Sequence, residues 1–465
     1  MRTKNKSALL IFLLALAVRL ISIDVTNHHV EGDGAGRYVP AAVKLYQGQM
    51  AEALKYTSSF VYPAFLAVIY TIFGEYQTPY SQASEPIQTP VMIAQAVTGA
   101  LACAIFYLTF SFIFCQFVAF MAGICGALYL PGAVWTTIQI RSEILSFFLI
   151  SVVGLVFTLL VRNGSLSRKH RFAISLALGF SLVLLTLNHR MYAGLIFFVV
   201  FTLILFPHSL PLKNRIIFGL IPLIISFFLL SFLWQEVIPK KNESQLESGL
   251  FGFDLLHSVM QMNSILIDDG LIDAPFYYRA KNDEPGELYL TVEQLKILGM
   301  TVDDGLYSLS RIKMWPQRSD KILGEWAVKL ILKHPIVFGL VSLKRVHMLW
   351  VEDLWVTQHN TNLKLRPSED YRKNRQWGLA ILSMLGYLIG VLALPGIFIF
   401  WRHSISTLAI LFYVILLLCI LHTHTAYALA VHPYILLYSI SCLVFLWFWV
   451  IKKNKYRQSV EKILL

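Results

Sequence analysis

The chain has 465 residues, of which 57% are hydrophobic and only 14% are charged, and its mean hydropathy is +0.63. No soluble domain of this size has such a composition. The net charge of +12 does not indicate nucleic-acid binding, because the basic residues lie mainly in short loops and at the C-terminal tail. This is the Lys/Arg excess of the cytoplasmic side of a membrane protein. These residues are Arg162, Arg168, Lys169, Arg171, Lys213, Arg215, Arg402, Lys452, Lys453, Lys455 and Arg457.

Apolar runs near 20 residues recur, and a helix of that length crosses roughly 30 Å of hydrocarbon. Backbone groups in lipid must be paired within their own segment, so such runs indicate helices. The first run follows Arg2, Lys4 and Lys6 as in a signal peptide, but it lacks a small-x-small cleavage site, and we expect a retained helix. Ten spans are predicted, at 7–23, 91–114, 117–137, 144–161, 172–187, 191–206, 216–234, 377–400, 404–421 and 425–450.

One further apolar run, 59–74, has 16 residues and carries Pro63 in its first turn. If it crossed the membrane, the basic loop 162–171 would lie outside. If it lies in the interface, that loop, 207–215 and 401–403 all lie inside with both termini. We therefore predict a helix on the outer leaflet, in a multi-pass plasma (inner) membrane protein whose N- and C-termini are cytoplasmic.

The predicted fold class is an all-α polytopic membrane protein, with about ten transmembrane helices, outer-face juxtamembrane helices and a polar extracytoplasmic segment. Residues 1–234 form an N-terminal transmembrane module with a long outer loop at 24–90. Residues 235–376 form the extracytoplasmic segment, which ends in an amphipathic helix. Residues 377–465 form the last transmembrane helices and a basic cytoplasmic tail.

Polar groups from five separate loops fall on the outer side in this threading. Ionisable groups at membrane depth are costly and usually face a cavity, so their convergence predicts an outward-facing active site. Each group also has a structural explanation, as a solvated loop, a helix start or a tight turn. The groups are Glu31, Asp33, Arg37, Tyr38, Arg141, Ser142, Glu143, Asn188, His189, Arg190, His422, His424 and His432.

No cofactor is indicated by these groups. The five cysteines form neither a disulfide framework nor a CxxC metal site. His422 and His424 are spaced like a metal pair, but a third ligand is not evident and residues two apart do not share a helix face. Binding of a divalent metal therefore remains possible, but the sequence does not indicate it. Arg19, inside the first span, is expected to extend to the outer headgroups.

Three motifs follow one another after the first helix. They are the loop aspartate Asp33, the pattern Tyr38-x-x-x-Ala42-x-x-Leu45, and a Pro-containing apolar helix over 62–74 that ends in Phe-Gly. Together they resemble the GT-C superfamily of integral-membrane glycosyltransferases, and within it the protein O-mannosyltransferases and lipid A aminoarabinose transferases. Arg141-Ser142-Glu143, Leu187-Asn-His-Arg190 and the stretch 334–350 are similar to further parts of that family.

The sequence departs from the family pattern at three places. Asp33 is followed by Gly34 and lies five residues before Tyr38, where relatives have an acidic neighbour and a spacing of four. Tyr62 replaces a Lys or His before the proline of the interfacial helix, and the last helix opens with Ala-Val-His-Pro rather than Arg-Tyr-x-x-Pro. The resemblance covers most of residues 1–240 and 330–450, through short and degenerate motifs.

The resemblance implies a polyprenyl-phosphate-sugar donor and a hydroxyl acceptor on a lipid, glycan or protein, with the catalytic loop at 24–90. One carboxylate serves as general base, and attack opposite the phosphate gives inversion. Arginine suits the phosphate through bidentate hydrogen bonds. The catalytic candidates are Asp33 and Glu31, and the substrate-binding candidates are Arg37, Tyr38, Tyr62, Arg141, Glu143, His189, Arg190 and Arg345.

Two other classes of function remain open from the residues alone. A transporter or flippase of a lipid-linked glycan needs a polar path through the full membrane depth, whereas the inner halves of these spans are apolar. A non-catalytic membrane scaffold needs no polar turns that converge on one face.

Overall fold

The computed structural model describes residues 2–25, 34–57, 59–73, 89–129, 132–133, 136–137, 139–162, 166–206, 211–232, 255, 277–281, 284–290, 296, 307–308, 317–351, 388–420 and 430–451. The chain divides into two compact units. The first comprises residues 1–234, 349–414 and 425–465, and the second comprises 235–348 and 415–424. Glu31, Asp33, His422 and His424 lie outside the described residues. The predicted division into three domains stays a prediction.

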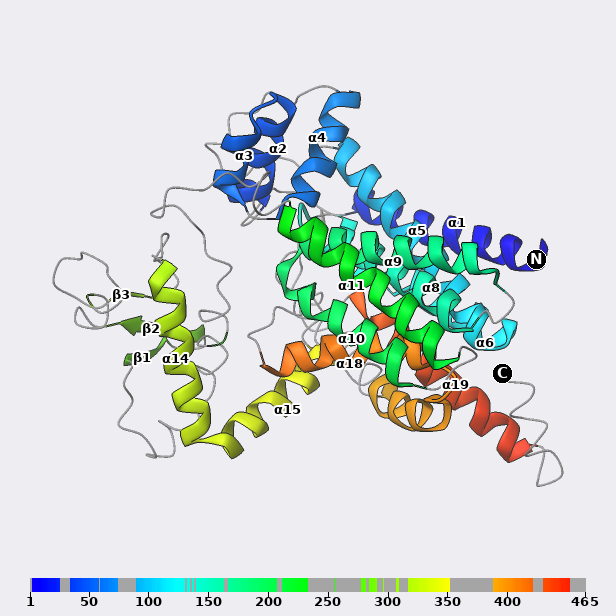
Figure 1. The fold of residues 1–465 in the computed structure, drawn as a ribbon. Helices are drawn as coiled ribbons and strands as arrows, with labels where there is room; N and C mark the ends of the chain where they lie inside the picture. Colours follow the sequence, from blue (N-terminus) through cyan, green and yellow to red (C-terminus); the bar gives the residue numbers. More distant parts are fainter. Residues whose placement is uncertain are drawn as a thin grey trace, which may run out of the picture. The chain divides into compact units, whose positions relative to one another are not determined.

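The first unit is a helix bundle (Figure 1). Each predicted span overlaps one helix, and five helices of the described residues are long and apolar enough to cross a membrane by length and composition. The prediction of an all-α polytopic membrane protein is therefore confirmed. The helices are α1 (Arg2–Val25), α5 (Thr89–Ile113), α6 (Gln116–Ala127), α8 (Glu143–Arg162), α9 (Arg168–Asn188), α10 (Ala193–Leu205), α11 (Leu212–Phe232), an unlabelled helix Leu388–Phe400, α18 (Ile405–Ile420) and α19 (His432–Ile451).

Helix α6 is shorter than the predicted span over 117–137. It ends at Ala127, and its last turn is closed by a hydrogen bond from the Leu128 N–H to the Ile124 carbonyl. Pro131-Gly132 follows in the sequence. A proline disfavours the helical conformation of the residue before it, which explains why the helix ends here.

Close packing and interhelical hydrogen bonds hold the C-terminal helices to α8. The Thr158 and Ser406 hydroxyls lie 2.8 Å apart and join α8 to α18. A Cβ atom on Gly154 would clash with the Tyr434 hydroxyl of α19, so the glycine leaves room for this approach. Small residues and polar side chains of this kind are the usual links between helices in lipid, where the hydrophobic effect does not draw helices together.

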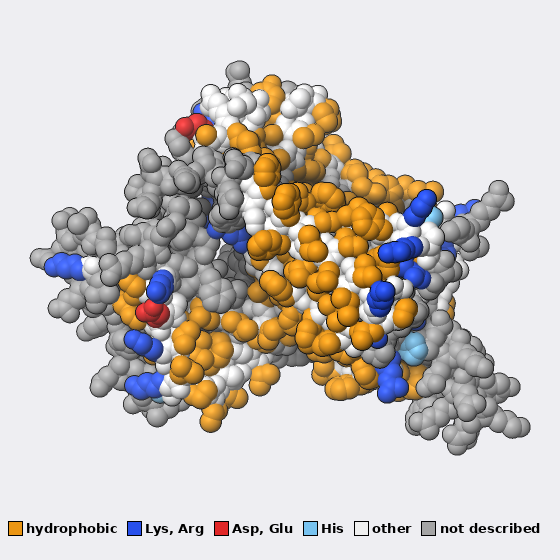
Figure 2. Space-filling view, in the orientation of Figure 1, with side chains coloured by type: hydrophobic (Ala, Val, Ile, Leu, Met, Phe, Trp, Pro, Cys, Tyr) orange, Lys and Arg blue, Asp and Glu red, His pale blue; other side chains and the backbone are white. Residues whose placement is uncertain are grey.

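Basic side chains gather at one end of the first unit, where α1 begins (Figure 2). Lys4 Nζ donates to the Ser111 carbonyl and Arg162 Nη2 donates to the Ile113 carbonyl, both at 2.8 Å, and these are the last carbonyls of α5. Arg215 Nη1 lies 3.3 and 3.0 Å from the carbonyls of Ile204 and Phe206, at the end of α10. Helix C-terminal carbonyls lack intrahelical partners and carry partial negative charge.

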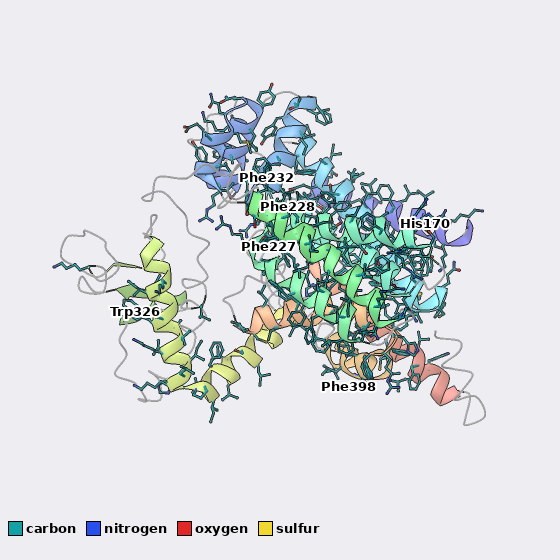
Figure 3. All side chains as sticks on the ribbon, viewed as in Figure 1. His170, Phe227, Phe228, Phe232, Trp326 and Phe398 are labelled. Atoms are coloured by element: carbon teal, nitrogen blue, oxygen red, sulfur yellow. The ribbon has the colours of Figure 1, made fainter. Side chains whose placement is uncertain are left out.

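The side-chain view shows the two ends of the bundle. His170, at the start of α9, lies at the basic end, whereas Phe227, Phe228 and Phe232 lie toward the opposite end of α11 (Figure 3). The described part of the basic loop 162–171 therefore lies at this end of the bundle. The side of the membrane that this end faces stays a prediction.

The opposite end carries four short elements, η1 (Gly34–Tyr38), α2 (Val39–Tyr46), α3 (Met50–Tyr56) and α4 (Val61–Phe73). The 13 residues of α4 rise about 20 Å, less than the roughly 30 Å of a hydrocarbon core. Tyr62, Leu66 and Tyr70 form its buried face, and Val68 and Ile72 on its other face are 58% and 68% exposed. That α4 lies in the interface stays a prediction, and its length agrees with it.

The second unit contains a small antiparallel sheet of order β1-β2-β3 that the sequence did not predict. Tyr278 pairs with Leu288 and Leu290 pairs with Tyr307. The amphipathic stretch is two helices bent by 100°, and the break falls at His334-Pro335, where a proline interrupts the helical hydrogen bonds. The elements are β1 (Tyr277–Lys281), β2 (Glu284–Leu290), β3 (Tyr307–Ser308), α14 (Gln317–Lys333) and α15 (Pro335–Val351).

The expectation for Arg19 was wrong. Its side chain does not extend to the headgroups but is buried in the bundle, with 1% of its surface exposed. Its Nη1 turns back to the Ala15 carbonyl at 3.2 Å. A Cβ atom on Gly99 of α5 would lie 2.4 Å from Arg19 Nε, so the glycine provides the space that lets the guanidinium lie between the helices.

The topology is tested by cysteine labelling from outside the cell, in a chain from which the five native cysteines are removed. We expect single cysteines in 24–58 and 240–370 to be labelled, and those in 163–170 to be protected until the membrane is permeabilised. Labelling of 163–170 in intact cells would contradict the arrangement derived from the basic loops.

Candidate functional site

A polar network joins three elements at the end of the bundle opposite the basic loops. The Tyr38 hydroxyl, where η1 passes into α2, lies 3.0 Å from the Ser142 hydroxyl, just before α8. Asn188 Nδ2, at the end of α9, donates to the Ser142 carbonyl and to the Ser146 hydroxyl, both at 2.9 Å. All four side chains are buried, and the network fixes the start of α8 against α2 and α9.

A second network fixes the segment that leads into α8. The Tyr62 hydroxyl of α4 donates to Gln95 Oε1 of α5 at 2.5 Å. Gln95 Nε2 in turn donates to the carbonyls of Thr137 and Gln139, at 2.8 and 3.1 Å. Gln95 is fully buried. It was not among the predicted site residues, and the signal that was missed is a lone amide inside an apolar span.

The two networks meet through their tyrosine rings. The rings of Tyr38 and Tyr62 pack edge to face, with centroids 5.1 Å apart and planes at 84°, and such pairs add to the gain from burial. Burial raises the pKa of Tyr62 well above its usual value, and the neighbouring Tyr70, Tyr38 and Glu143 raise it further. The Tyr62 hydroxyl is therefore a neutral hydrogen-bond donor at physiological pH.

Arg141 and Glu143 flank Ser142 at the start of α8. Arg141 Nη1 lies 3.9 Å from Glu143 Oε1, and their side chains are 22% and 9% exposed. Glu143 is the first residue of α8, so its carboxylate also interacts with the positive end of the helix dipole. Arg141-Ser142-Glu143 is thus a helix start, and the same geometry places a cation and a carboxylate beside the tyrosines.

His189 and Arg190 form the turn between α9 and α10. Helix α9 ends at Asn188, His189 is extended, and Arg190 opens a single 3-10 turn, η2 (Arg190–Tyr192). The Tyr413 hydroxyl of α18 donates to the Met191 carbonyl within that turn. The Phe60 N–H donates to the Leu187 carbonyl at 3.2 Å, which joins the entry to α4 to the end of α9.

The structure thus brings Tyr38, Tyr62, Arg141 and Glu143 together, and places His189 and Arg190 at the same end of the bundle. Arg37 is exposed on η1, one residue before Tyr38. Arg345 lies on α15, which belongs to the second unit up to Met348, and its predicted role stays a prediction. Asp33 and Glu31 precede Gly34, the first described residue of this segment, so their assignment stays a prediction as well.

The arrangement offers arginine cations and a carboxylate around the ends of α8 and α9, and the hydroxyls of Tyr38 and Tyr62 are engaged within the two networks. The arginines and the carboxylate suit an anionic ligand with hydroxyl groups, because arginine donates to phosphate and sugar oxygens and a carboxylate accepts from hydroxyls. Within the described ranges, no group of three or more His, Cys, Asp or Glu residues is placed to hold a metal ion.

Comparison with known proteins gives a fold likeness only. No protein-family model and no curated protein matches the sequence. The chain is similar to the archaeal oligosaccharyltransferase AglB from Archaeoglobus fulgidus, in a structure with an inhibitory peptide and a dolichol-phosphate, at 14% identity and a TM-score of 0.50. The match covers 97% of this chain and 51% of AglB, so the chain spans about half the length of AglB.

Two structures of ArnT from Cupriavidus metallidurans also match. The apo structure has 15% identity, covers 94% of this chain and 76% of ArnT, and has a TM-score of 0.37. The structure with undecaprenyl phosphate has 14% identity, covers 92% and 77%, and has a TM-score of 0.39. AglB is a glycosyltransferase of the GT-C superfamily, and its TM-score shows that this chain has the same fold, as the sequence resemblance implied.

The network around Gln95 is tested by Gln95→Leu. The substitution leaves the carbonyls of Thr137 and Gln139 and the Tyr62 hydroxyl buried without their partner, so we expect the free energy of unfolding to fall by about 1–3 kcal/mol. Thermal unfolding in detergent measures this change. Gln116→Leu, at the exposed start of α6, is the matched control, and an equal effect of the two variants would contradict the role of the network.

Proposed function

We propose that the chain is a membrane glycosyltransferase that moves a sugar from a polyprenyl-phosphate donor to a hydroxyl group of a lipid, glycan or protein acceptor. The observation that carries this proposal is the fold likeness to AglB over 97% of the chain, in a structure that contains a dolichol-phosphate. A lipid-phosphate carrier suits a multi-pass membrane protein, because its tail lies in the bilayer while its phosphate and sugar lie at the interface.

The polar end of the bundle supports the proposal independently of the comparison. The short helices α2, α3 and α4 and the turns before α8 and after α9 all meet there, and the basic loops lie at the other end. If the basic end is cytoplasmic, the polar end faces outward. The donor head and the acceptor would then meet at the outer face, beside Tyr38, Tyr62 and Arg141.

The chemistry requires one base and a site for the leaving phosphate. A hydroxyl group is a poor nucleophile, and a carboxylate that accepts its proton during attack is sufficient as a general base. Phosphate is a good leaving group, so the second carboxylic acid that a glycoside hydrolase uses is not needed. Attack on the anomeric carbon opposite the phosphate inverts its configuration. We assign the base to Asp33, with Glu31 as the rival.

Arginines would balance the charge that develops on the phosphate. Arg141 and Arg190 are half-buried at the polar end, and a guanidinium in such an environment binds phosphate oxygens more strongly than one in bulk water. Glu143, held beside Arg141, can orient this guanidinium or accept a hydrogen bond from a sugar hydroxyl.

The reaction is tested with the purified full chain in nanodiscs and a polyprenyl-phosphate sugar carrying a labelled sugar. The acceptor is found by comparing lipid-linked sugars and surface glycans of cells with and without the protein. In the cells without the protein, we expect the lipid-linked sugar donor to accumulate and one surface glycan to lack a sugar. Movement of the lipid-linked sugar across liposomes without sugar transfer would contradict the proposal and favour a flippase.

Asp33→Asn tests the base. It keeps the shape of the side chain and removes its basicity, so transfer should fall by about 10²–10⁴-fold, while donor binding and membrane insertion remain. Single-turnover transfer measures the change, and Glu325→Gln on the exposed face of α14 is the control. Loss of transfer in Glu31→Gln but not in Asp33→Asn would move the role to Glu31. Normal transfer in both variants would contradict the mechanism.

Arg141→Ala and Arg190→Ala test the phosphate contact. A hydrogen bond to a charged group contributes about 1.5–3 kcal/mol, so each variant should weaken donor use by about 10-fold to 100-fold. Donor titration in the transfer assay measures this, and Arg402→Ala at the exposed basic end is the control. Unchanged donor affinity in both variants would assign the phosphate to Arg37 or Arg345.

A further inference from the structure

Helix α10 begins without a side-chain cap from its own N-cap residue. The first N–H groups of a helix have no partners within the helix. Tyr192 occupies the N-cap position of α10 and forms no side-chain hydrogen bond with them. Leu195, in this first turn, is fully buried, so its N–H group needs an oxygen from the protein rather than from water.

The hydroxyl of Tyr413, on α18, provides that oxygen. The N–H groups of Gly194 and Leu195 donate to it. The same hydroxyl donates to the Met191 carbonyl in η2. One phenol oxygen thus joins both sides of the junction between η2 and α10. Only 6% of Tyr413 is exposed, so its side chain supports the turn and does not face a ligand.

The packing of α10 fixes the Tyr413 ring in this place. A Cβ atom on Gly194 would lie 2.9 Å from both Cε2 and the hydroxyl oxygen of Tyr413, a distance at which the ring must move, so the glycine leaves room for it. The ring of Phe198, about one turn further along α10, packs against Tyr413 with centroids 5.4 Å apart and planes at 62°. Aromatic pairs favour such edge-to-face contacts. The position of the hydroxyl therefore follows from packing as well as from hydrogen bonds.

The turn that these contacts hold is the one that carries Arg190. Asn188, two residues before Arg190, is bound to the start of α8. Met191, the residue after Arg190, is bound to Tyr413. Arg190 thus lies between two anchors, and the single 3-10 turn that it opens has hydrogen bonds of poorer geometry than those of an α-helix. The orientation of its guanidinium depends on both anchors.

We propose that Tyr413 is a positioning residue for Arg190, so that the affinity of the site for a lipid-linked phosphate depends on a hydroxyl that the donor does not touch. The inference rests on the proposed function, in which Arg190 binds the donor phosphate. Bidentate binding of phosphate by a guanidinium requires a fixed orientation of its plane. Loss of the Tyr413 hydroxyl leaves the charge of Arg190 in place but releases the turn that orients it.

The test measures binding of a C55 polyprenyl phosphate to the full chain in phosphatidylcholine nanodiscs, without any sugar transfer. Tyr413→Phe removes the hydroxyl and keeps the ring, and we expect the affinity to fall by about 2-fold to 10-fold, the contribution of one hydrogen bond. Gly194→Ala keeps the hydroxyl but displaces it, so the affinity should fall as well. Tyr438→Phe is the matched control and should bind as the unaltered chain does, because it also removes a buried hydroxyl contact with α18, to Thr407 at 2.8 Å.

A double-mutant cycle separates the positioning of Arg190 from a general effect on the fold. In the Arg190→Ala background, Tyr413→Phe has no guanidinium to orient and should cause no further loss of affinity. In the Arg141→Ala background it should keep its full effect, because Arg141 lies beside Glu143 at the start of α8 and not on the turn. The uncharged polyprenol of the same length should bind alike to the unaltered chain and to every variant.

An equal loss of affinity from Tyr413→Phe with and without Arg190 would overturn the positioning role, and so would an equal loss in Tyr438→Phe. Unchanged affinity in both Tyr413→Phe and Gly194→Ala would overturn it and leave the proposed function intact. Unchanged affinity in Arg190→Ala would overturn it too, since the turn would then carry no phosphate contact. If the unaltered chain does not bind polyprenyl phosphate, the proposed function fails together with the positioning role.

Discussion

The amide of Gln95 is the interaction on which the polar end of the bundle depends. A helix that passes through lipid satisfies its own backbone, but the carbonyls at the end of a helix and beyond it must find partners elsewhere. The carbonyls of Thr137, the last described helical residue before α8, and of Gln139 find theirs in the side chain of Gln95, which also accepts from Tyr62. One side chain thereby connects the short helix α4, the helix α5 and the segment that leads to Arg141 and Glu143. The position of the candidate site follows from this need to satisfy buried carbonyls.

The network of Tyr38, Ser142, Ser146 and Asn188 likewise provides partners for buried polar groups, at the start of α8. Asn188 ends α9 and donates to Ser142 and Ser146, so the turn that carries His189 and Arg190 is held to the start of α8. The aromatic contact of Tyr38 with Tyr62 closes the arrangement. Residues that are far apart in the sequence, in the loops after α1, before α8 and after α9, are therefore positioned by buried hydrogen bonds on rigid helix ends. Such support is what a site that must hold two substrates in a fixed geometry requires.

The sequence predicted the helices and the end of the bundle to which the polar residues belong, because hydropathy and the Lys/Arg distribution follow from the lipid environment and not from particular contacts. It identified Tyr38, Tyr62, Arg141 and Glu143, which the structure brings together. It missed Gln95, since one amide in an apolar span carries no spacing pattern, and it missed the end of α6 at Ala127 and the small sheet of the second unit. It was wrong about Arg19, because the decisive feature is Gly99 on another helix.

Three half-buried cations at the basic end, Lys4, Arg162 and Arg215, donate hydrogen bonds to carbonyls at helix ends. Lys4 and Arg162 both bind the last turn of α5, and Arg215 binds the last turn of α10. The charges that are predicted to orient the chain in the membrane thus also cap its helices. If they set the orientation, orientation and helix-end stability depend on the same side chains. A chain that exchanged these residues to reverse its orientation would also lose the caps at the ends of α5 and α10.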